Sequence, residues 1–360
     1  MPKDRINEID LLRFLAVIAV VIFHYAFRGY ASDGMSIMPY PLAPLAKYGF
    51  FGVHLFFLIS GFVILMTASS GSLRRFFVSR FSRLYPAFWA CCTITFIATT
   101  LIGAPHYTAS ISQYLVNMTM MSDFVRVGSI DGVYWSLFIE LRFYAFIAVI
   151  LMIGKIRKAE LFLTVWLIAC ITLDVLHISK LRSFLIVDYA GFFIAGATFF
   201  LIWSKGLSRS RVAMIVGSFS LAMYETILEM PHFEQQFNTQ INNYIVAGII
   251  TALFIVMLLI SLRRTGSFGR RQWIFAGGIT YPLYLLHQNI GFMIFNIAYP
   301  TINQHVLLWG TMLVMIGAAA AVHIFVEQRF SLRVKNSMDH SIDYIHRSMI
   351  RFSTQIRQRF

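Results

Sequence analysis

The stretch 9–29, IDLLRFLAVIAVVIFHYAFRG, decides the fold. It is almost wholly apolar, and at 1.5 Å per residue it is long enough to cross about 30 Å of hydrocarbon as a helix. It does not resemble a cleavable signal, because it carries Arg13 and His24 inside it and no small-residue cleavage pattern follows. The stretch therefore predicts a permanent transmembrane helix.

The composition predicts the same environment for the rest of the chain. Of its 360 residues 58% are apolar and 13% are charged, which is too little polar surface to cover a water-soluble fold. Because runs of similar length recur throughout, we predict an all-α polytopic membrane protein with about ten transmembrane helices. The predicted spans are 9–29, 45–68, 84–103, 133–153, 160–178, 184–203, 211–228, 241–262, 273–297 and 306–327.

The distribution of the basic residues excludes nucleic acid as the reason for the net charge of +14. Lys and Arg concentrate in alternate loops, which is the positive-inside pattern of membrane proteins. The loops predicted to lie outside carry only Arg28, Lys47, Arg126, Lys180 and Arg182. This pattern predicts an even number of spans and places both termini in the cytoplasm.

The domain organisation is simple, with one transmembrane domain over 1–330 and a tail over 331–360. In the tail, Met338, Ile342, Ile345, Met349, Phe352 and Ile356 recur every three or four residues and form one apolar stripe on a basic helix. We interpret the tail as an amphipathic helix on the inner leaflet rather than a short coiled coil, because its arginines suit lipid headgroups. Neither interpretation carries chemistry.

The three cysteines, Cys91, Cys92 and Cys170, all fall inside apolar spans. Neither a disulfide framework nor a zinc spacing is present, so we interpret them as packing residues and expect no metal site.

Ionisable residues inside the predicted spans are the candidates for chemistry. Each costs about 3 kcal/mol or more to insert, so each is a functional candidate, although pairing between helices or snorkelling explains any single one equally well. They are Arg13, His24, Glu140, Arg142, His287 and Glu327.

Two spacings refine this set. Arg13 and His24 are eleven residues apart, so on a helix they point the same way with about 16 Å between them, and His24 would be the natural proton carrier. Arg80 and Arg83 share one helical face and could each donate paired hydrogen bonds to phosphates. Positive-inside charge alone explains the two arginines equally well.

Two further spans place polar groups in hydrocarbon. Ser136, Glu140 and Tyr144 share a face at i, i+4 and i+8 while Arg142 points elsewhere, so the Glu140 carboxylate could orient a base or bind a sugar. His287 ends the run Tyr281-Pro282-Leu283-Tyr284-Leu285-Leu286-His287, and a hydrogen-bonding structural role suits it equally.

Five motifs, taken in order over about residues 5–330, resemble the acyltransferase-3 family of integral membrane acyltransferases. They are Ile9-Asp10-Leu11-Leu12-Arg13 with His24, Phe50-Phe51-Gly52 with Ser60-Gly61-Phe62, Arg80-x-x-Arg83-Leu84-Tyr85-Pro86, Trp135-Ser136-Leu137 with Glu140 and Phe143-Tyr144, and the run that ends at His287. The chain departs from the family pattern at Gln328, where many members have a basic residue after the Glu.

The resemblance implies a function and its parts. It implies transfer of an acyl group from cytoplasmic acyl-CoA, usually acetyl-CoA, to a hydroxyl of a cell-envelope or exported glycan, catalysed in the inner (plasma) membrane. We predict that Arg13, Arg80 and Arg83 bind acyl-CoA and that His24, Glu140 and His287 are catalytic, with His24 as general base. The partners would be acyl-CoA, a glycan or lipid-linked sugar and membrane lipids. The sequence leaves open whether the protein is a monomer or a homo-oligomer, and whether His24 itself carries the acyl group.

A function from another class remains open. A proton-coupled transporter or flippase of a lipid-linked sugar or small anion could use His24, Glu140 and His287 as a proton relay. Internal repeats, which mark many transporters, are not evident in the sequence.

Overall fold

The computed structural model describes residues 6–32, 35–176 and 178–357, and over these ranges its regular structure is entirely helical. The elements are α1 (Asn7–Phe23), η1 (His24–Arg28), α2 (Gly29–Ala31), α3 (Ala43–Ala46), η2 (Lys47–Phe50), α4 (Phe51–Ala68), α5 (Leu73–Ile102), α6 (Ile111–Asn117), η3 (Ser122–Val125), α7 (Tyr134–Met152), η4 (Ile156–Lys158), α8 (Ala159–Val175), α9 (Ser179–Phe184), α10 (Val187–Lys205), α11 (Arg209–Phe237), α12 (Asn243–Ser261), α13 (Ser267–Arg270), α14 (Ile274–Ala298), α15 (Gln304–Val322), η5 (His323–Glu327) and α16 (Gln328–Arg357).

The prediction of an all-α polytopic membrane protein is confirmed. Eight helical segments of the described chain are long and apolar enough to cross a membrane. The two other predicted spans are also helical, but α8 has only 17 residues and α14 is interrupted by polar residues such as Gln288 and Asn289. Ten crossings, and cytoplasmic termini, therefore stay predictions.

The helix that contains the third predicted span begins before that span. Helix α5 starts at Leu73 instead of residue 84, because the Ser72 side chain caps it by accepting a hydrogen bond from the Arg75 backbone N at 3.3 Å. The arginines of 74–83 lower the apolar signal of this segment without ending its helix. Arg80 and Arg83 consequently lie within a regular helix.

Helices α4 and α10 form the centre of the bundle and are its most buried crossing segments. Two glycines allow this close packing. A Cβ at Gly196 of α10 would lie 1.9 Å from the Leu58 carbonyl oxygen, and one at Gly61 of α4 would lie 2.2 Å from the Phe193 carbonyl oxygen. Since these contacts are with backbone atoms, only glycine fits, and α4 is fixed in place.

The loop between α5 and α7 folds back onto α14. The Asp131 carboxylate accepts hydrogen bonds from the backbone N of Val133 and of Asn289, each at 3.1 Å. Gln288 packs against Gly132, and the Asn289 side chain donates to the Ile130 carbonyl at 2.8 Å. This loop thereby supports the part of α14 that carries His287.

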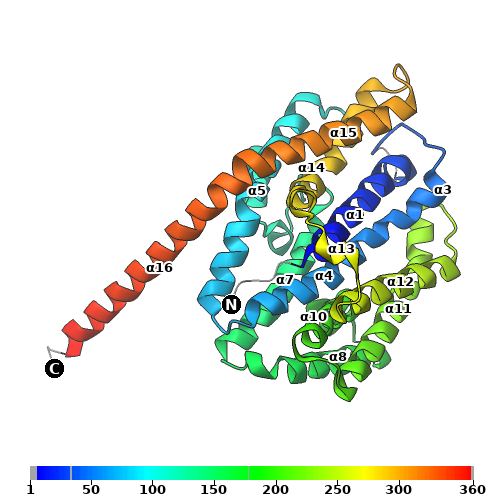
Figure 1. The fold of residues 1–360 in the computed structure, drawn as a ribbon. Helices are drawn as coiled ribbons and strands as arrows, with labels where there is room; N and C mark the ends of the chain where they lie inside the picture. Colours follow the sequence, from blue (N-terminus) through cyan, green and yellow to red (C-terminus); the bar gives the residue numbers. More distant parts are fainter. Residues whose placement is uncertain (1–5, 33–34, 177, 358–360) are drawn as a thin grey trace.

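Helices α15 and α16 form one nearly continuous rod through the π-helical turn η5, and α16 extends well beyond the bundle (Figure 1). Arg74 of α5 forms ion pairs with Asp339 and Asp343 and donates to the Asp339 carbonyl at 2.8 Å, which holds the start of the tail against the bundle. The predicted tail helix is present. The side chains of its stripe beyond Tyr344 lie outside the described part of the chain, so its place on a leaflet stays a prediction.

Candidate active site

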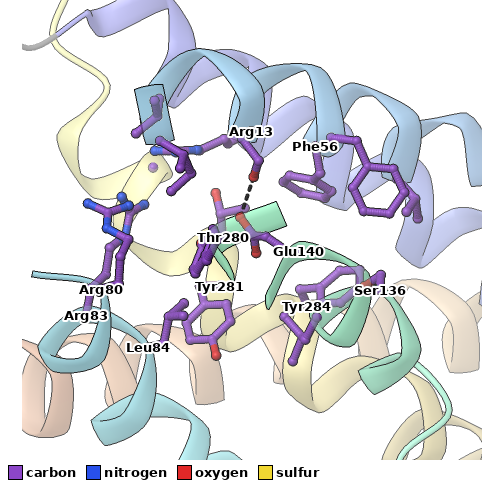
Figure 2. A pocket seen from close by; sticks show the side chains of 18 residues that line it. Arg13, Phe56, Arg80, Arg83, Leu84, Ser136, Glu140, Thr280, Tyr281 and Tyr284 are labelled. Carbon is purple, nitrogen blue, oxygen red and sulfur yellow. Dashed lines mark hydrogen bonds between the residues drawn. The ribbon is translucent and has the colours of Figure 1, made fainter. Parts of the chain in front are cut away.

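Among the cavities of the described chain, two lie between helices that carry the predicted site residues, and we name them after their charged residues. The arginine cavity lies between α1, α4, α5, α7 and α14. Its polar lining consists of Arg13, Ser60, Arg80, Arg83, Ser136, Glu140, Tyr144, Thr280, Tyr281 and Tyr284. Figure 2 shows Arg80 and Arg83 side by side, facing a space that Arg13, Glu140 and Tyr281 also border.

The three guanidinium groups of this cavity are only partly satisfied. Arg13 lies 3.9 Å from Asp10, which packs against Gly277 of α14. Arg80 donates to Thr67 and Ser79 at 3.3 Å each, but its Nε is buried without a partner. Within the described chain, nothing accepts a hydrogen bond from Arg83. Like charges that converge on a cavity with unused donors favour an anionic ligand.

Glu140 is the single carboxylate in the lining of this cavity. It accepts a hydrogen bond from Ser60 of α4, drawn as the dashed line in Figure 2. One turn earlier on α7, the Ser136 hydroxyl lies 2.6 Å from the Tyr284 hydroxyl. The predicted shared face of Ser136, Glu140 and Tyr144 is thus observed.

The histidine cavity is lined by His24, Arg28 and His54 together with residues of η2, α7, α10, α11 and α14. Aromatic rings form most of the remaining lining: Phe23, Phe50, Trp135, Tyr189, Phe233, Phe237 and Tyr284. Glu229 and Gln236 add polar groups. Aromatic faces beside a few polar side chains suit a small ligand with both apolar and polar surfaces.

The two cavities meet at one wall. Val53 of α4 and Tyr284 of α14 line both of them. The hydrogen bond between Tyr284 and Ser136 holds the ring of this wall in place. A reacting group bound in one cavity is therefore separated from the other by only a few side chains.

His24 lies in the histidine cavity at the start of the π-helical turn η1, and His287 lies behind it. His24 Nδ1 and His287 Nε2 lie 3.1 Å apart, so a hydrogen bond joins the two imidazoles. His24 Nδ1 also lies 2.8 Å from the Val20 carbonyl oxygen, and His287 Nδ1 lies 2.8 Å from that of Tyr284. Tyr25 donates to the His287 carbonyl at 2.8 Å and ties η1 to α14.

The structure thus separates the predicted site residues into two groups. Arg13, Arg80, Arg83 and Glu140 line the arginine cavity, while His24 lines the histidine cavity. His287 is fully buried and reaches the site through His24.

The other two buried candidates lie elsewhere. Arg142 lies over the Phe138 ring and donates to the Ser183 carbonyl at 2.9 Å, whereas Glu327 pairs with His323 in η5. Neither residue lines a cavity described above.

Sequence reasoning missed Arg28, His54 and Gln288. Arg28 was counted among the charges of an outer loop, yet it lines the histidine cavity and contacts His24. The spacing of four residues from His24 to Arg28 on an extended first helix was the available signal. His54 is concealed in an aromatic run, and nothing local marks Gln288.

The fold and the two cavities define a class: a polytopic helical membrane protein with charged and imidazole groups lining two neighbouring cavities inside its helical bundle. A family model described as acyltransferase domain matches residues 6–326. The chain therefore belongs to the acyltransferase-3 family of integral membrane proteins, as its five motifs indicate.

Two curated relatives illustrate the similarity. The chain is 26% identical over 327 residues to peptidoglycan O-acetyltransferase OatA of Listeria monocytogenes, covering 80% of this chain and 50% of that protein. It is 30% identical over 173 residues to nodulation protein 10 of Rhizobium leguminosarum bv. viciae, covering 41% of this chain and 45% of that one. The chain thus spans about half the length of these relatives. No solved structure matches it.

Proposed function

We propose that this protein is a membrane-bound O-acyltransferase, with the acyl donor in the arginine cavity and the acceptor hydroxyl in the histidine cavity. The observation that carries the proposal is the wall of Val53 and Tyr284 common to the two cavities. A transfer reaction needs two different substrates close together, and two differently lined cavities separated by one thin wall would bring the substrates to within a few side chains of each other.

The donor we propose is acyl-CoA, and acetyl-CoA in particular. Its phosphates would be bound by Arg13, Arg80 and Arg83, since three guanidinium groups that line one cavity suit an anion of more than one charge. The thioester arm would then extend toward Glu140 and Tyr284. That a relative is named an O-acetyltransferase supports acetyl as the acyl group.

The acceptor we propose is a hydroxyl of a cell-envelope or exported glycan, either free or lipid-linked. Aromatic rings such as Trp135 and Tyr189 beside Glu229 suit a sugar ring, which has apolar faces and polar edges. The relative named for peptidoglycan acts on a glycan of this kind.

His24 is the general base in this proposal. Its Nε2 takes the proton of the acceptor hydroxyl as the oxygen attacks the thioester carbon. The C–S bond then breaks, and the CoA thiolate leaves with the proton that His24 Nε2 gives back, which regenerates the neutral imidazole. His287 accepts from His24 Nδ1 and holds the ring, while Glu140 orients the groups around the reacting thioester through Ser60.

The proposed site is the plasma membrane, with the arginine cavity open to the cytoplasm, because that is where acyl-CoA is made. The positive-inside distribution of Lys and Arg supports this orientation.

One experiment tests the proposal. Purified protein is given acetyl-CoA with a labelled acetyl group and envelope glycan from cells that lack the gene. We expect release of free CoA with transfer of the label to glycan as an alkali-labile ester. Transport of a lipid-linked sugar with no thioester consumed would overturn the proposal in favour of a transporter.

A further inference from the structure

Arg28 has no role in the mechanism above, yet it touches the atom on which that mechanism depends. Its Nη1 lies 3.1 Å from His24 Nε2 and 3.0 Å from the Gln288 side-chain oxygen. We propose that Arg28 is a further catalytic residue that covers His24 Nε2 in the resting enzyme and binds the carbonyl oxygen of the acyl group during transfer. This inference rests on the proposed function.

The hydrogen bonds assign the protons of both histidines. A guanidinium group can only donate, so His24 Nε2 facing Arg28 must be unprotonated and Nδ1 must carry the proton. His24 Nδ1 then donates toward the Val20 carbonyl and His287 Nε2. Since His287 Nδ1 donates to the Tyr284 carbonyl, its Nε2 is an acceptor as well. The basic atom of His24 is therefore the one that Arg28 covers.

Arg28 lacks a nearby counter-ion. Within the described ranges no carboxylate forms a salt bridge with Arg28. The Asp131 carboxylate attracts it, but from farther away than a salt bridge. Its neighbours are a neutral imidazole and an amide, and its Nε is buried without a partner. A cation held in this way inside a membrane is costly unless negative charge forms beside it during function.

Acyl transfer forms such a charge next to His24. When the acceptor hydroxyl replaces Arg28 at His24 Nε2, its proton moves to that nitrogen and its oxygen bonds to the thioester carbon. The electron pair of the carbonyl π bond moves to the carbonyl oxygen, and Arg28 donates to this oxyanion. On collapse the C=O bond re-forms, the C–S bond breaks and Arg28 is released to return to Gln288.

The movement of Arg28 also avoids an unfavourable pair of like charges. Once His24 holds two protons it is an imidazolium, and a guanidinium 3.1 Å away would oppose its formation. Transfer of Arg28 to the oxyanion places the two cations on either side of the new negative charge. The same displacement makes base activation depend on an acceptor being bound.

The test compares Arg28→Ala and Arg28→Lys with the matched control Arg126→Ala, which removes an exposed arginine outside both cavities. Rates are measured with purified protein, acetyl-CoA and envelope glycan from cells that lack the gene. We expect Arg28→Ala to lower kcat by about 10²- to 10³-fold, the usual effect of losing an oxyanion donor, with the KM of both substrates within about threefold. Lys should restore part of kcat, and Arg126→Ala should be as active as wild type.

Chemical rescue separates catalysis from folding. Free guanidinium, at concentrations far below those that unfold proteins, should raise kcat of Arg28→Ala and leave His24→Ala inactive. Wild-type kcat in Arg28→Ala would overturn the inference, and so would a raised acceptor KM with unchanged kcat, which would make Arg28 an anchor for an anionic acceptor. Inactive wild-type protein would count against the proposed function itself.

Discussion

A guanidinium group within a bilayer needs a partner, and this chain places such groups at two points along its first helix. Arg13 has Asp10 within 3.9 Å and joins Arg80 and Arg83, while Arg28 lies beside His24. The first set is suited to a ligand that carries its charge permanently. The second is suited to a charge that exists only during reaction.

The arginine pair gives the first prediction at this scale. Arg80→Ala or Arg83→Ala should raise the KM for acyl-CoA, because each removes a charge-assisted phosphate contact worth about 1.5 to 3 kcal/mol. Lys should restore binding only in part, because its ammonium group cannot donate two parallel hydrogen bonds to one phosphate as a planar guanidinium group does. Steady-state kinetics with varied acetyl-CoA measure the effect.

The control for this pair is Arg142→Ala, since Arg142 is also an arginine within a span but binds the Ser183 carbonyl away from both cavities. Its KM for acyl-CoA should match wild type. Unchanged donor KM in both Ala variants of the pair would show that Arg80 and Arg83 serve only to orient the helix.

His24 gives the second prediction. His24→Ala should lower kcat by about two to four orders of magnitude, the usual share of general-base catalysis, while equilibrium binding of acetyl-CoA persists. His24→Gln should be nearly as inactive, because an amide can keep a hydrogen bond to Arg28 but cannot take up a proton. A Gln variant with most of the wild-type rate would assign the proton transfer to another group.

Residue-level prediction succeeded for the regular helix α7 and failed for contacts at the π-helical turn and between helices. The common face of Ser136, Glu140 and Tyr144 follows from helical periodicity and is observed in the arginine cavity. The contact of Arg28 with Gln288 joins positions 260 apart in sequence, and no local pattern encodes such a meeting.

At the scale of elements, the π-helical turn η1 and the close pair α4 and α10 set the positions of the site. A π turn inserts an extra residue into a helix, and such turns often mark functional positions. Here η1 begins at His24 and ends at Arg28, so the irregularity coincides with the two residues that contact each other. Helix α4 supplies Ser60 to one cavity and His54 to the other.

The contact between α4 and α10 gives the third prediction. Gly196→Ala should destabilise the protein by about 3 kcal/mol or more, because the new Cβ would meet the Leu58 carbonyl and force two backbones apart. Gly248→Ala in α12 is the control, since no atom lies within 4 Å of its new Cβ, and it should be neutral or slightly stabilising.

Unfolding of both variants in detergent measures the difference. Equal stability of Gly196→Ala and Gly248→Ala would show that the two helices are not in close contact. If Gly196→Ala folds but loses activity, the displaced α4 has moved Ser60 and His54 from their cavities.

The elements themselves were largely predictable, because a long apolar run in a bilayer has few alternatives to a helix. Each of the ten predicted regions contains a helix over its described residues. The start of α5 was missed since the Ser72 cap precedes charged residues that a hydropathy average treats as loop. The π turn was not predictable, because its sequence continues an ordinary helical run.

At the scale of the molecule, helices that are far apart in the sequence line the two cavities on either side of the wall of Val53 and Tyr284. Residues of α1, α4, α5, α7 and α14 line the arginine cavity, and α10 and α11 contribute to the histidine cavity. The order of motifs along the chain predicted which residues belong to one family site. It could not predict two cavities, because their division depends on how distant helices cross.

Topology gives the fourth prediction. Single cysteines at positions 110 and 235 should react with an impermeant thiol reagent added to intact cells, and those at 157 and 267 should react only after the membrane is opened. All four positions are exposed, so reactivity reports the side of the membrane and not burial. Labelling of 157 or 267 in intact cells would invert the proposed orientation.

The wall of Val53 and Tyr284 has a consequence for the cell as well as for the reaction. An energised membrane stores energy as a difference in proton concentration and voltage, and a continuous file of water from one face to the other would discharge it. In the proposed orientation, the arginine cavity opens to one aqueous compartment and the histidine cavity to the other. This wall would then keep water and ions from passing between them. An acetyl group is small and uncharged. In the proposed reaction, the cell would therefore transfer a chemical group to the far side of the membrane without losing ions through this protein.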